Sequence, residues 1–439
     1  MTRDCETIIK CRRSALLAVP MGWLLIASSA SAGSTDDPST LAEVAVNTNP
    51  AIKSVEKQIA SLRHKAVAAV RWSDPVFAVE YSNLPWNSWA LGDSPMSGVQ
   101  FKVQQKLTLP GKNDRRSETA RKEAEVKGWE LLEKKNQLKA LVKRTYWNLA
   151  LVRQLRTINE RHIILVDQLL AAVRAKYQVG KVGQHDLLSL EVLKKRLEDD
   201  LGDFDQKERE LLAAINAALH REATTTVTTP DELPVTTTTK PLSALIQLAE
   251  KYRPNLKQAR ASSKWKRLAA EQAKYERWPD ITVWAGYRIR TPAGADPGTD
   301  FFNVGLAVPL PFDYTGHAKA MQEQHLASAA AADESYRAAL DEIRASLESS
   351  LASWQRATRK VGNYESNIIP GADQTLKATL AAYQTDRADF ASLYQAEVQL
   401  LQFERAAKVA QATTQIEQIK VEASVGRDLD DLPKSEVIR

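Results

Sequence analysis

Histidine and cysteine side chains are the first candidates for catalysis or metal binding in this sequence, and their positions argue against both. The six histidines stand at positions 64, 162, 185, 220, 317 and 325, and no two form a pair at metal-ligand spacing on a shared helix face. Both cysteines, Cys5 and Cys11, lie near the N-terminus. The sequence also lacks a nucleophile elbow, a phosphate-binding loop and a metalloprotease helix. We therefore expect no catalytic residue, no cofactor and no protein-bound metal, and hence no enzyme.

The composition indicates a folded chain without a nucleic-acid-binding surface. Of the 439 residues, 44% are hydrophobic and 26% are charged, which is enough apolar material for a large buried core. The formal net charge is +6, but the basic residues are spread among acidic ones and lack interleaved aromatic residues. Nucleic acid is therefore excluded as a partner.

The first 32 residues have the organisation of a signal peptide. Basic residues from Arg3 to Arg13 precede an apolar run, Ala15–Ile26, and the small residues Ala30–Ala32 offer a cleavage site. A membrane anchor is the alternative, but the run is short for a bilayer and Pro20 interrupts it. Removal of residues 1–32 would take both cysteines with it, leaving no disulfide and no N-terminal cysteine for lipidation.

The rest of the chain contains an internal repeat of one sequence unit. Matching residues recur at a shift of 206 positions: Tyr177-Gln178 returns as Tyr383-Gln384, and Glu191-Val192 returns as Glu397-Val398. The first unit spans residues 33–223 and the second spans 241–424. A linker at 224–240, rich in threonine and proline, separates them because β-branched residues and proline disfavour helix. Residues 425–439 form a polar tail.

Each unit predicts a helix, two strands, a very long helix and a shorter helix. The expected helices are 38–71, 112–177 and 184–218 in the first unit, and 241–277, 317–383 and 390–423 in the second. At 1.5 Å per residue, the helix from Lys112 to Tyr177 would be about 100 Å long. The two shorter helices, placed end to end, would match that length and build a wall of uniform height. A soluble coiled coil explains the helical periodicity equally well.

Four segments alternate between apolar and polar residues, which is the pattern of a strand with one apolar face. The clearest runs from Val99 to Leu109; the others lie at 77–81, 281–289 and 302–308. Each is expected to run about 9–11 residues, enough to cross a bilayer at a tilt. A lone segment of this kind usually belongs to a soluble sheet, but two matched pairs favour membrane strands. Loops 83–96 and 292–300 join the pairs, and five tryptophans could form interfacial girdles: Trp72, Trp86, Trp89, Trp278 and Trp284.

Self-association follows if these strands enter a membrane. No window after the leader reaches eighteen apolar residues, so a membrane-spanning part would have to be a closed β-barrel. Four strands cannot close a barrel, whereas three copies of four strands would give twelve. We expect a homotrimer embedded in a lipid bilayer.

The sequence resembles the TolC-like outer membrane efflux proteins over nearly its whole mature length. The residues that carry the resemblance are the paired helix openings Asn49-Pro50 and Arg253-Pro254, the junction Leu109-Pro110-Gly111-Lys112, and the helix tip from Tyr177 to Asp186. The junction, preceded by Asn83-Leu84-Pro85 and Met96, is most similar to the branch that serves heavy-metal resistance pumps.

The resemblance implies a fold that is mainly α with a small β part. It implies a trimer whose transmembrane β-barrel receives four strands per protomer and whose long-helix α-barrel extends through the periplasm. The chain would reside in the outer membrane of a Gram-negative-type cell. Its implied partners are a periplasmic adaptor (membrane fusion) protein and an inner-membrane transporter of the RND type.

The resemblance also assigns the residues expected to dock the adaptor. The family's Val-Gly-Leu tip falls on Val179, Gly180 and Lys181, and the second unit has Thr385, Asp386 and Arg387 at the same place. The paired carboxylates that narrow the entrance in many relatives would fall on Ser392 and Gln395, neither of which is acidic.

Other residues near the tips have roles suggested by their types. Gly180 and Gly183 lie where two antiparallel helices reverse, and glycine tolerates the positive φ of such turns. Both glycines are candidate adaptor contacts as well as candidate turn residues. Asp186 is a candidate cap for the following helix and a candidate adaptor contact. Glu191 and Glu397 could line the pore entrance and attract cations, although glutamates on a solvated helix face are common.

The function expected from these observations is a passive exit duct of a tripartite efflux system, with heavy-metal cations as the preferred cargo. A duct for drug efflux or type I protein secretion is the alternative within the same class. A periplasmic structural coiled coil is the alternative outside it, but it has no use for four strands of bilayer length.

Overall fold

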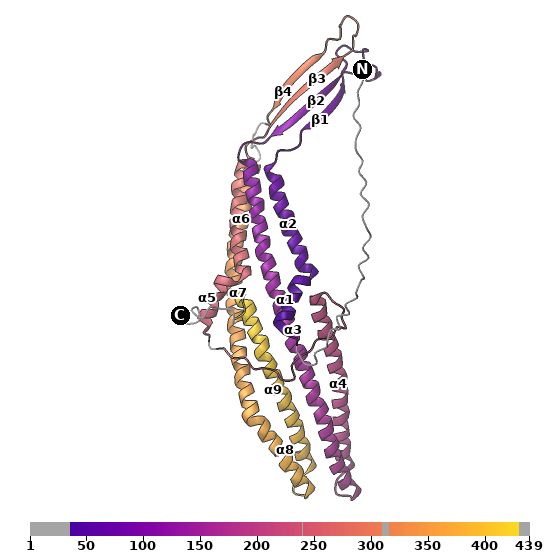
Figure 1. Ribbon diagram of the computed structural model, residues 1–439, viewed down its shortest axis with the longest axis vertical. Coiled ribbons are helices and arrows are strands. Elements are labelled where there is room, and N and C mark those ends of the chain that lie inside the picture. The colour runs from indigo at the N-terminus through magenta and orange to yellow at the C-terminus, as the bar shows by residue number, and fades with distance from the viewer. Residues whose placement is uncertain (1–35, 239, 310–315, 430–439) are drawn as a thin grey trace, which may run out of the picture. The chain divides into compact units, whose positions relative to one another are not determined.

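The computed structural model of the protein describes residues 36–238, 240–309 and 316–429. The expected signal peptide, residues 1–32, and the tail from residue 430 onward lie outside the described residues. Residues 36–429 contain long helices with a small sheet at one end (Figure 1).

The two units have the same order of elements. The first contains α1 (Pro38–Thr48), α2 (Pro50–Val70), β1 (Val76–Ser82), β2 (Gly98–Leu107), α3 (Lys112–Gln178) and α4 (Gln184–Leu219). The second contains α5 (Leu242–Tyr252), α6 (Pro254–Glu276), β3 (Ile281–Arg290), β4 (Phe301–Ala307), α7 (His317–Asn363), a π-helical turn (Tyr364–Ile368), α8 (Ile369–Gln384) and α9 (Phe390–Val425).

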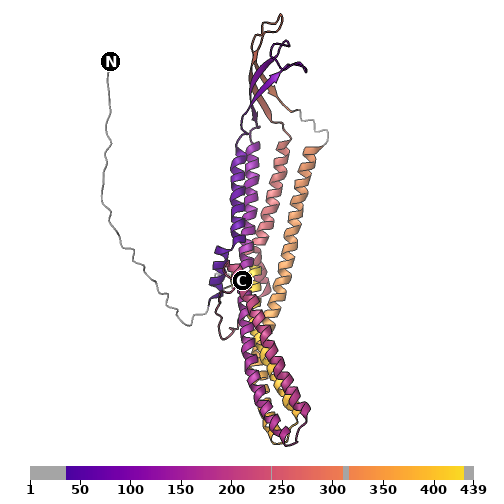
Figure 2. The same cartoon turned by 90° about the vertical axis from the view of Figure 1, so that its right-hand side faces the viewer.

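Helix α3 confirms the very long helix that the sequence predicts. It has 67 residues without interruption, or about 100 Å at 1.5 Å per residue. Helices α1 and α2 pack along its first half and α4 packs along its second half (Figures 1 and 2). Helix α3 also contacts α6 and α9, so it joins the two units.

Prolines break two helices that were predicted to be continuous. The expected helix 38–71 is interrupted at Asn49, and the expected helix 241–277 is interrupted at Arg253. Each residue precedes a proline and has an extended backbone, with ψ of 124° at Asn49 and 119° at Arg253. The proline ring clashes with a helical conformation of the residue before it, which explains both breaks.

A third proline changes the expected helix 317–383. The helix widens into a π-helical turn over Tyr364–Ile368, and α8 then begins with Pro370 as its second residue. Proline has no N–H to donate to the carbonyl four residues earlier, and a π-turn is one way in which a helix accommodates this loss. The prediction of one unbroken helix was therefore wrong at this point.

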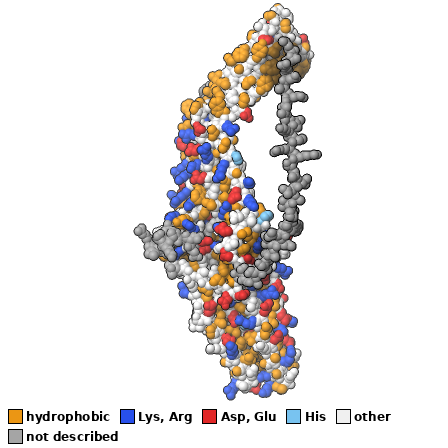
Figure 3. Space-filling model, viewed as in Figure 1, with side chains coloured by type: hydrophobic (Ala, Val, Ile, Leu, Met, Phe, Trp, Pro, Cys, Tyr) orange, Lys and Arg blue, Asp and Glu red, His pale blue; other side chains and the backbone are white. Residues whose placement is uncertain are grey.

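The four strands form one antiparallel sheet in the order β1-β2-β3-β4. The register aligns the predicted apolar positions across all four strands: Phe77 lies opposite Val103, Val103 opposite Ala285, and Ala285 opposite Val304. The neighbouring polar row contains Lys102, Gly286 and Asn303. One face of the sheet is therefore apolar and solvent-exposed in this chain, and the other is largely polar. Figure 3 shows hydrophobic side chains gathered over the strands and charged ones over the helices.

The strands differ from the prediction in length and in one tryptophan. Strands β1 and β4 have seven residues each, fewer than the expected 9–11, because both lie at the edges of the sheet and pair on one side only. Trp284 lies in the polar register, with the ammonium of Lys102 4.7 Å from its ring centre, so it is not part of a girdle on the apolar face. Trp72, Trp86, Trp89 and Trp278 are exposed beside the strands.

In the part of the chain that the structure describes, no helix combines the length and apolar character needed to cross a membrane.

The threonine-rich linker crosses the middle of the helical body without forming a helix. Val227 and Leu233 are buried in the core that α1, α3, α4 and α9 share. The indole of Trp354 on α7 donates a hydrogen bond to the carbonyl of Thr236 at 2.8 Å. The described part of the linker therefore contacts and helps to hold together helices of both units.

A buried lysine ties the helices to the sheet. Lys112, at the start of α3, has a side chain only 4% exposed, and its ammonium lies 2.9 Å from the carboxylate of Asp280 just before β3. It also donates to the carbonyl of Trp278 at 2.9 Å and lies 3.2 Å from Glu276. A buried ammonium is stable only with such partners, so this cluster fixes where α3 meets the second hairpin.

Replacement of this lysine should destabilise the fold. We expect Lys112→Met to reduce the free energy of unfolding by about 2 kcal/mol, because Asp280 would keep only the more exposed Lys106 as an ionic partner. Lys122→Met removes an exposed pair with Glu125 and should change it by less than about 0.5 kcal/mol. Unfolding of the two variants, followed by circular dichroism, measures the difference, and equal stability would contradict the role of Lys112.

Candidate functional site

The first helix tip is a tight turn between α3 and α4, at the end of the helical body away from the sheet (Figure 1). Gly180 has a φ of +74°, and its N–H donates to the carbonyl of Tyr177 at 2.9 Å. The N–H of Lys181 donates to the carbonyl of Lys176 at 3.0 Å. These two bonds close the end of α3 in the manner of a Schellman motif. Gly183 has a φ of −81°, so the expectation of a positive φ there was wrong.

The second tip, between α8 and α9, repeats this backbone without a glycine. Asp386 takes the place of Gly180 with a φ of +62°, and its N–H donates to the carbonyl of Tyr383 at 3.2 Å. The N–H of Arg387 donates to the carbonyl of Ala382 at 2.8 Å. Aspartate is one of the few residues that adopt this conformation at modest cost. The 206-residue repeat in the sequence is therefore a repeat of turn geometry.

The cap of the helix after the first tip differs from the prediction. Asp186 does not cap α4, because the residue at the N-cap is Gly183 and Asp186 lies inside the first turn with 8% exposure. Its carboxylate still has the sign that a helix N-terminus favours. In the second tip, Asp389 is the cap and accepts a hydrogen bond from the N–H of Ser392 at 2.9 Å.

The two tips of one chain are linked through a single carboxylate. Asp386 forms ion pairs with Lys176 and with Lys181, both on the other tip. Hydrogen bonds from these two ammonium groups lower the pKa of Asp386 to about 2. The ammonium of Lys176 also lies 4.3 Å from the ring centre of Tyr383, which is buried. Lys181, expected only as an adaptor contact, thus also belongs to this link.

The outer surface of the tips is available for contact in this chain. Val179 is 68% exposed, and Gly180, Thr385 and Arg387 are exposed as well. An apolar side chain at the end of a helical hairpin, flanked by charged residues, is suited to bind another protein.

The residues expected at the pore entrance fall into two groups. Ser392 and Gln395 are exposed on α9, and Glu191 is partly exposed on α4, 3.4 Å from Arg174. Glu397 is different, because it is only 1% exposed and its carboxylate lies 2.7 Å from Nδ1 of His162. In this conformation Glu397 is an internal residue of the helical packing, so its side chain does not face a pore.

His162 lies in a buried ionic cluster that the sequence did not single out. Its Nδ1 contacts Glu397 and its Nε2 lies 2.9 Å from Glu404, so a histidine on α3 is held between two carboxylates of α9. A neutral imidazole carries one N–H and can donate only one of these bonds, whereas an imidazolium donates both. Burial alone would lower the pKa of His162, but the bonds and charges of the two glutamates outweigh it and raise the pKa.

Further charged groups surround this cluster. Arg161 on α3 also pairs with Glu404. Arg405 on α9 donates to Asn159 on α3 and lies 2.8 Å from Asp200 on α4. The arrangement joins α3, α4 and α9 by buried and half-buried ionic contacts midway between the linker and the tips. One sequence pattern could have indicated this cluster, because Glu397 and Glu404 stand seven residues apart, on the same face of α9.

The second unit matches the model of one known protein family. Residues 245–427 match the family model described as outer membrane efflux protein. The match begins within α5 and extends to the end of α9. No curated protein matches the chain.

The fold matches solved structures of bacterial membrane proteins. VceC, an outer membrane protein of Vibrio cholerae, aligns with 89% of this chain and 96% of its own at 16% identity, with a TM-score of 0.71. A membrane protein of Pseudomonas aeruginosa aligns over 92% and 93% at 14% identity, with a TM-score of 0.75. MtrE, the outer membrane channel of Neisseria gonorrhoeae, solved in its open state, aligns over 89% of each chain at 15% identity, with a TM-score of 0.68. These matches confirm the predicted fold class, mainly helical with a small β part.

Removal of the tip link should loosen both turns. We expect Asp386→Asn to accelerate amide hydrogen exchange in residues 177–183 and 383–389 by about two- to fivefold, because the amide cannot hold two ammonium groups as a carboxylate does. Asp373→Asn is the matched control, since Asp373 pairs only with Lys377 on its own helix. Exchange measured by mass spectrometry tests this, and equal rates in both variants would refute the link.

The same link should resist mild acid. Because the pKa of Asp386 is about 2, wild-type exchange protection should persist down to about pH 4.

The histidine cluster should make stability depend on pH. The raised pKa of His162 means that its contribution is complete below the unfolded pKa of about 6.5 and is lost as pH rises through the folded pKa. We expect His162→Gln to lower the free energy of unfolding by about 2 kcal/mol at pH 6 and to flatten its fall above pH 7. His64→Gln, which alters an exposed residue of α2, should leave the wild-type profile unchanged. Parallel pH profiles for wild type and His162→Gln would rule out this role.

Proposed function

We propose that this chain is a member of the outer membrane efflux protein family and forms one third of a trimeric exit channel. The observation that carries the proposal is the four-stranded sheet, which has an exposed apolar face and two edge strands at one end of a helical body whose longest helix, α3, is about 100 Å long. The family match of residues 245–427 and the likeness to channels such as MtrE support it.

The sheet accounts for the proposed assembly. Three copies would place β4 of one chain beside β1 of the next and close a barrel of twelve strands, with the apolar rows outside and the polar rows inside. In lipid, an open edge would leave backbone N–H and C=O groups without partners, which is why closure is needed. The helices below would continue as an α-barrel through the periplasm.

The tips account for the proposed partners. Val179, Gly180 and Lys181 on one tip, with Thr385, Asp386 and Arg387 on the other, would dock a periplasmic adaptor protein, and Gly183 and Asp186 would support the first tip. The adaptor would connect the channel to an inner-membrane transporter of the RND type. Ser392 and Gln395 are exposed residues of the same region, Glu191 is a partly exposed one, and all three would lie near the entrance. The transporter would supply the energy, since the channel is proposed to be passive.

Heavy-metal cations are the proposed cargo. The support is the resemblance of the junction Leu109-Pro110-Gly111-Lys112 and the preceding loop to the metal-exporting branch. Deletion of the gene should sensitise cells to metal salts rather than to organic drugs, and restoration by the wild-type gene is the control. Unchanged metal tolerance together with increased drug sensitivity would contradict a metal cargo and indicate that the channel exports organic drugs.

A charge on the outer face of an edge strand should prevent assembly. We expect Phe302→Lys to abolish recovery of trimers from the outer membrane, because a lysine facing lipid costs about 2–4 kcal/mol near the bilayer midplane. Asn303→Lys places the same charge on the polar face one residue away and should still assemble. The mass of the detergent-solubilised complex and its conductance in planar bilayers provide the readout. Equal assembly of both variants, or a stable wild-type monomer without conductance, would contradict the proposal.

A further inference from the structure

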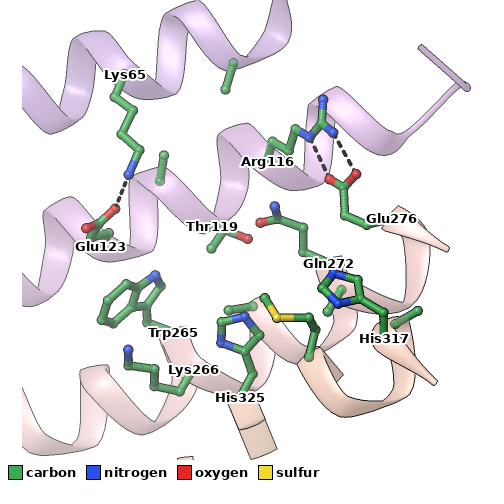
Figure 4. A pocket seen from close by; sticks show the side chains of 16 residues that line it. Lys65, Arg116, Thr119, Glu123, Trp265, Lys266, Gln272, Glu276, His317 and His325 are labelled. Atoms are coloured by element: carbon green, nitrogen blue, oxygen red, sulfur yellow. Dashed lines mark hydrogen bonds and ion pairs between the residues drawn. The ribbon is translucent and has the colours of Figure 1, made fainter. Parts of the chain in front are cut away.

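A cavity of about 700 Å³ lies among helices α2, α3, α6 and α7, on the sheet side of the linker (Figure 4). Its wall includes residues from the start of α3, the end of α6 and the start of α7. The tips and the histidine cluster described above lie elsewhere on the chain, so this cavity belongs to neither.

Except for Lys266, whose ammonium lies 4.0 Å from the ring centre of Trp265, the charged groups of this cavity are paired with one another. Lys65 lies 2.9 Å from Glu123. Arg116 forms two parallel bonds with Glu276, at 2.6 and 2.7 Å, and Lys112 adds a third contact to that carboxylate at 3.2 Å. Glu123 and Glu276 are the only acidic residues of the lining. The cavity therefore offers no free carboxylate to a hard cation.

Three uncharged donor side chains of the same lining come from one helix. His317, Met321 and His325 follow one another at intervals of four residues on α7, and all three line the cavity. Residues four apart on a helix are neighbours on one face, so the thioether lies between the two imidazoles. Figure 4 shows both rings on the side of α7 that faces α3 and α6. Among the described residues, no hydrogen bond or ion pair engages either ring.

This donor set selects one class of ion. A thioether is a soft ligand that favours Cu(I), whereas calcium and magnesium require oxygen ligands. A zinc site normally needs three or four protein ligands, and the described residues contain no group of three histidine, cysteine, aspartate or glutamate side chains that could hold a metal. Ions such as Cu(I) and Ag(I) accept two ligands in a linear arrangement, which one imidazole nitrogen and one sulfur satisfy.

We propose that His317, Met321 and His325 form a binding site for a soft monovalent cation of the Cu(I)/Ag(I) class, with Met321 as the shared ligand. The two histidines stand eight residues apart, about 12 Å along the helix, so they cannot hold the same ion together. Met321 binds the ion with one imidazole or with the other, and each chain holds one ion at a time. Binding of the ion at this site is an equilibrium of the folded chain and does not require transport.

The proposed site departs from the expectation that the protein binds no metal. That expectation counted histidines in pairs and left the methionine between two of them out of account. Of the two methionines in the described residues, Met96 lies in the loop between β1 and β2, and Met321 alone lines this cavity.

Silver binding to the purified full-length protein tests the proposal. Ag⁺ is the probe, and Cys5 and Cys11 are first replaced by serine so that no thiol competes. Equilibrium dialysis with elemental analysis should find one bound Ag⁺ per chain. Met321→Leu, which keeps the side-chain volume and removes the sulfur, should weaken binding by at least about tenfold. The double variant His317→Gln/His325→Gln should weaken it similarly, and each single variant should weaken it less.

The controls separate this site from general metal binding. Met96→Leu and His64→Gln should bind silver as the parent protein does, and Zn²⁺ should not be retained. Wild-type affinity in Met321→Leu, an equal loss in Met96→Leu, or zinc retained as tightly as silver would each overturn the proposal.

A measurement on the unaltered site guards against a folding defect in the variants. With methionine labelled with ¹³C in its methyl group, the resonance of Met321, assigned by its absence from the spectrum of Met321→Leu, should shift when Ag⁺ is added. A resonance that does not move at saturating Ag⁺ overturns the proposal whatever the variants do. Because the test measures binding alone, it can fail while the channel function stands, and a failed channel assay leaves it intact.

Discussion

The unpaired edges of the four-stranded sheet are the constraint on which the rest of the account depends. Within the described residues, β1 and β4 each pair with one neighbour, and the face that carries Phe77, Val103 and Val304 is exposed. A sheet with this face in water would lose the stabilisation that apolar burial supplies, and a sheet with these edges in lipid would leave backbone groups unsatisfied. Edge-to-edge joining of identical sheets would pair the backbone groups, and a lipid bilayer would cover the apolar face. The proposed ring would therefore complete the sheet of each chain.

In the proposed assembly, the helices would extend this ring into a duct. Helix α3 spans about 100 Å without a break, and α2 and α4 flank its two halves. Helix α3 therefore packs against another helix along both halves of its length. Ionic clusters fix the layers at different heights. Lys112 anchors α3 to the sheet, His162 joins α3 to α9 in the lower half, and Asp386 joins the two tips. The site proposed around Met321 lies near the upper end of the same wall, at the start of α7.

Local patterns in the sequence predicted most of the fold. Alternation placed Phe77, Val103 and Val304 on one face, and the 206-residue repeat predicted that Asp386 would stand where Gly180 stands. The proline breaks were also local, and the paired openings Asn49-Pro50 and Arg253-Pro254 marked two of them, although the expected helix bounds ran through both. The contacts that the sequence did not predict are long-range. Glu397 looks like a solvated helix-face residue until α3 brings His162 against it, 235 positions away. Lys112 and Asp280 are likewise 168 positions apart, so no spacing rule relates them.

The pairing of β1 with β4 of another chain can be measured by disulfide formation in the outer membrane. In cells producing the chain with Val79→Cys, a second cysteine would replace Phe302, Val304 or Leu306 in turn. Strands β1 and β4 of one chain are separated by two strands, or about 14 Å, so a disulfide within one chain is excluded. The control pair Phe101→Cys/Tyr287→Cys stands directly opposite within one sheet. The account predicts oxidised species of two and three chains for at least one β1–β4 pair. Cross-linking of the control alone would contradict it.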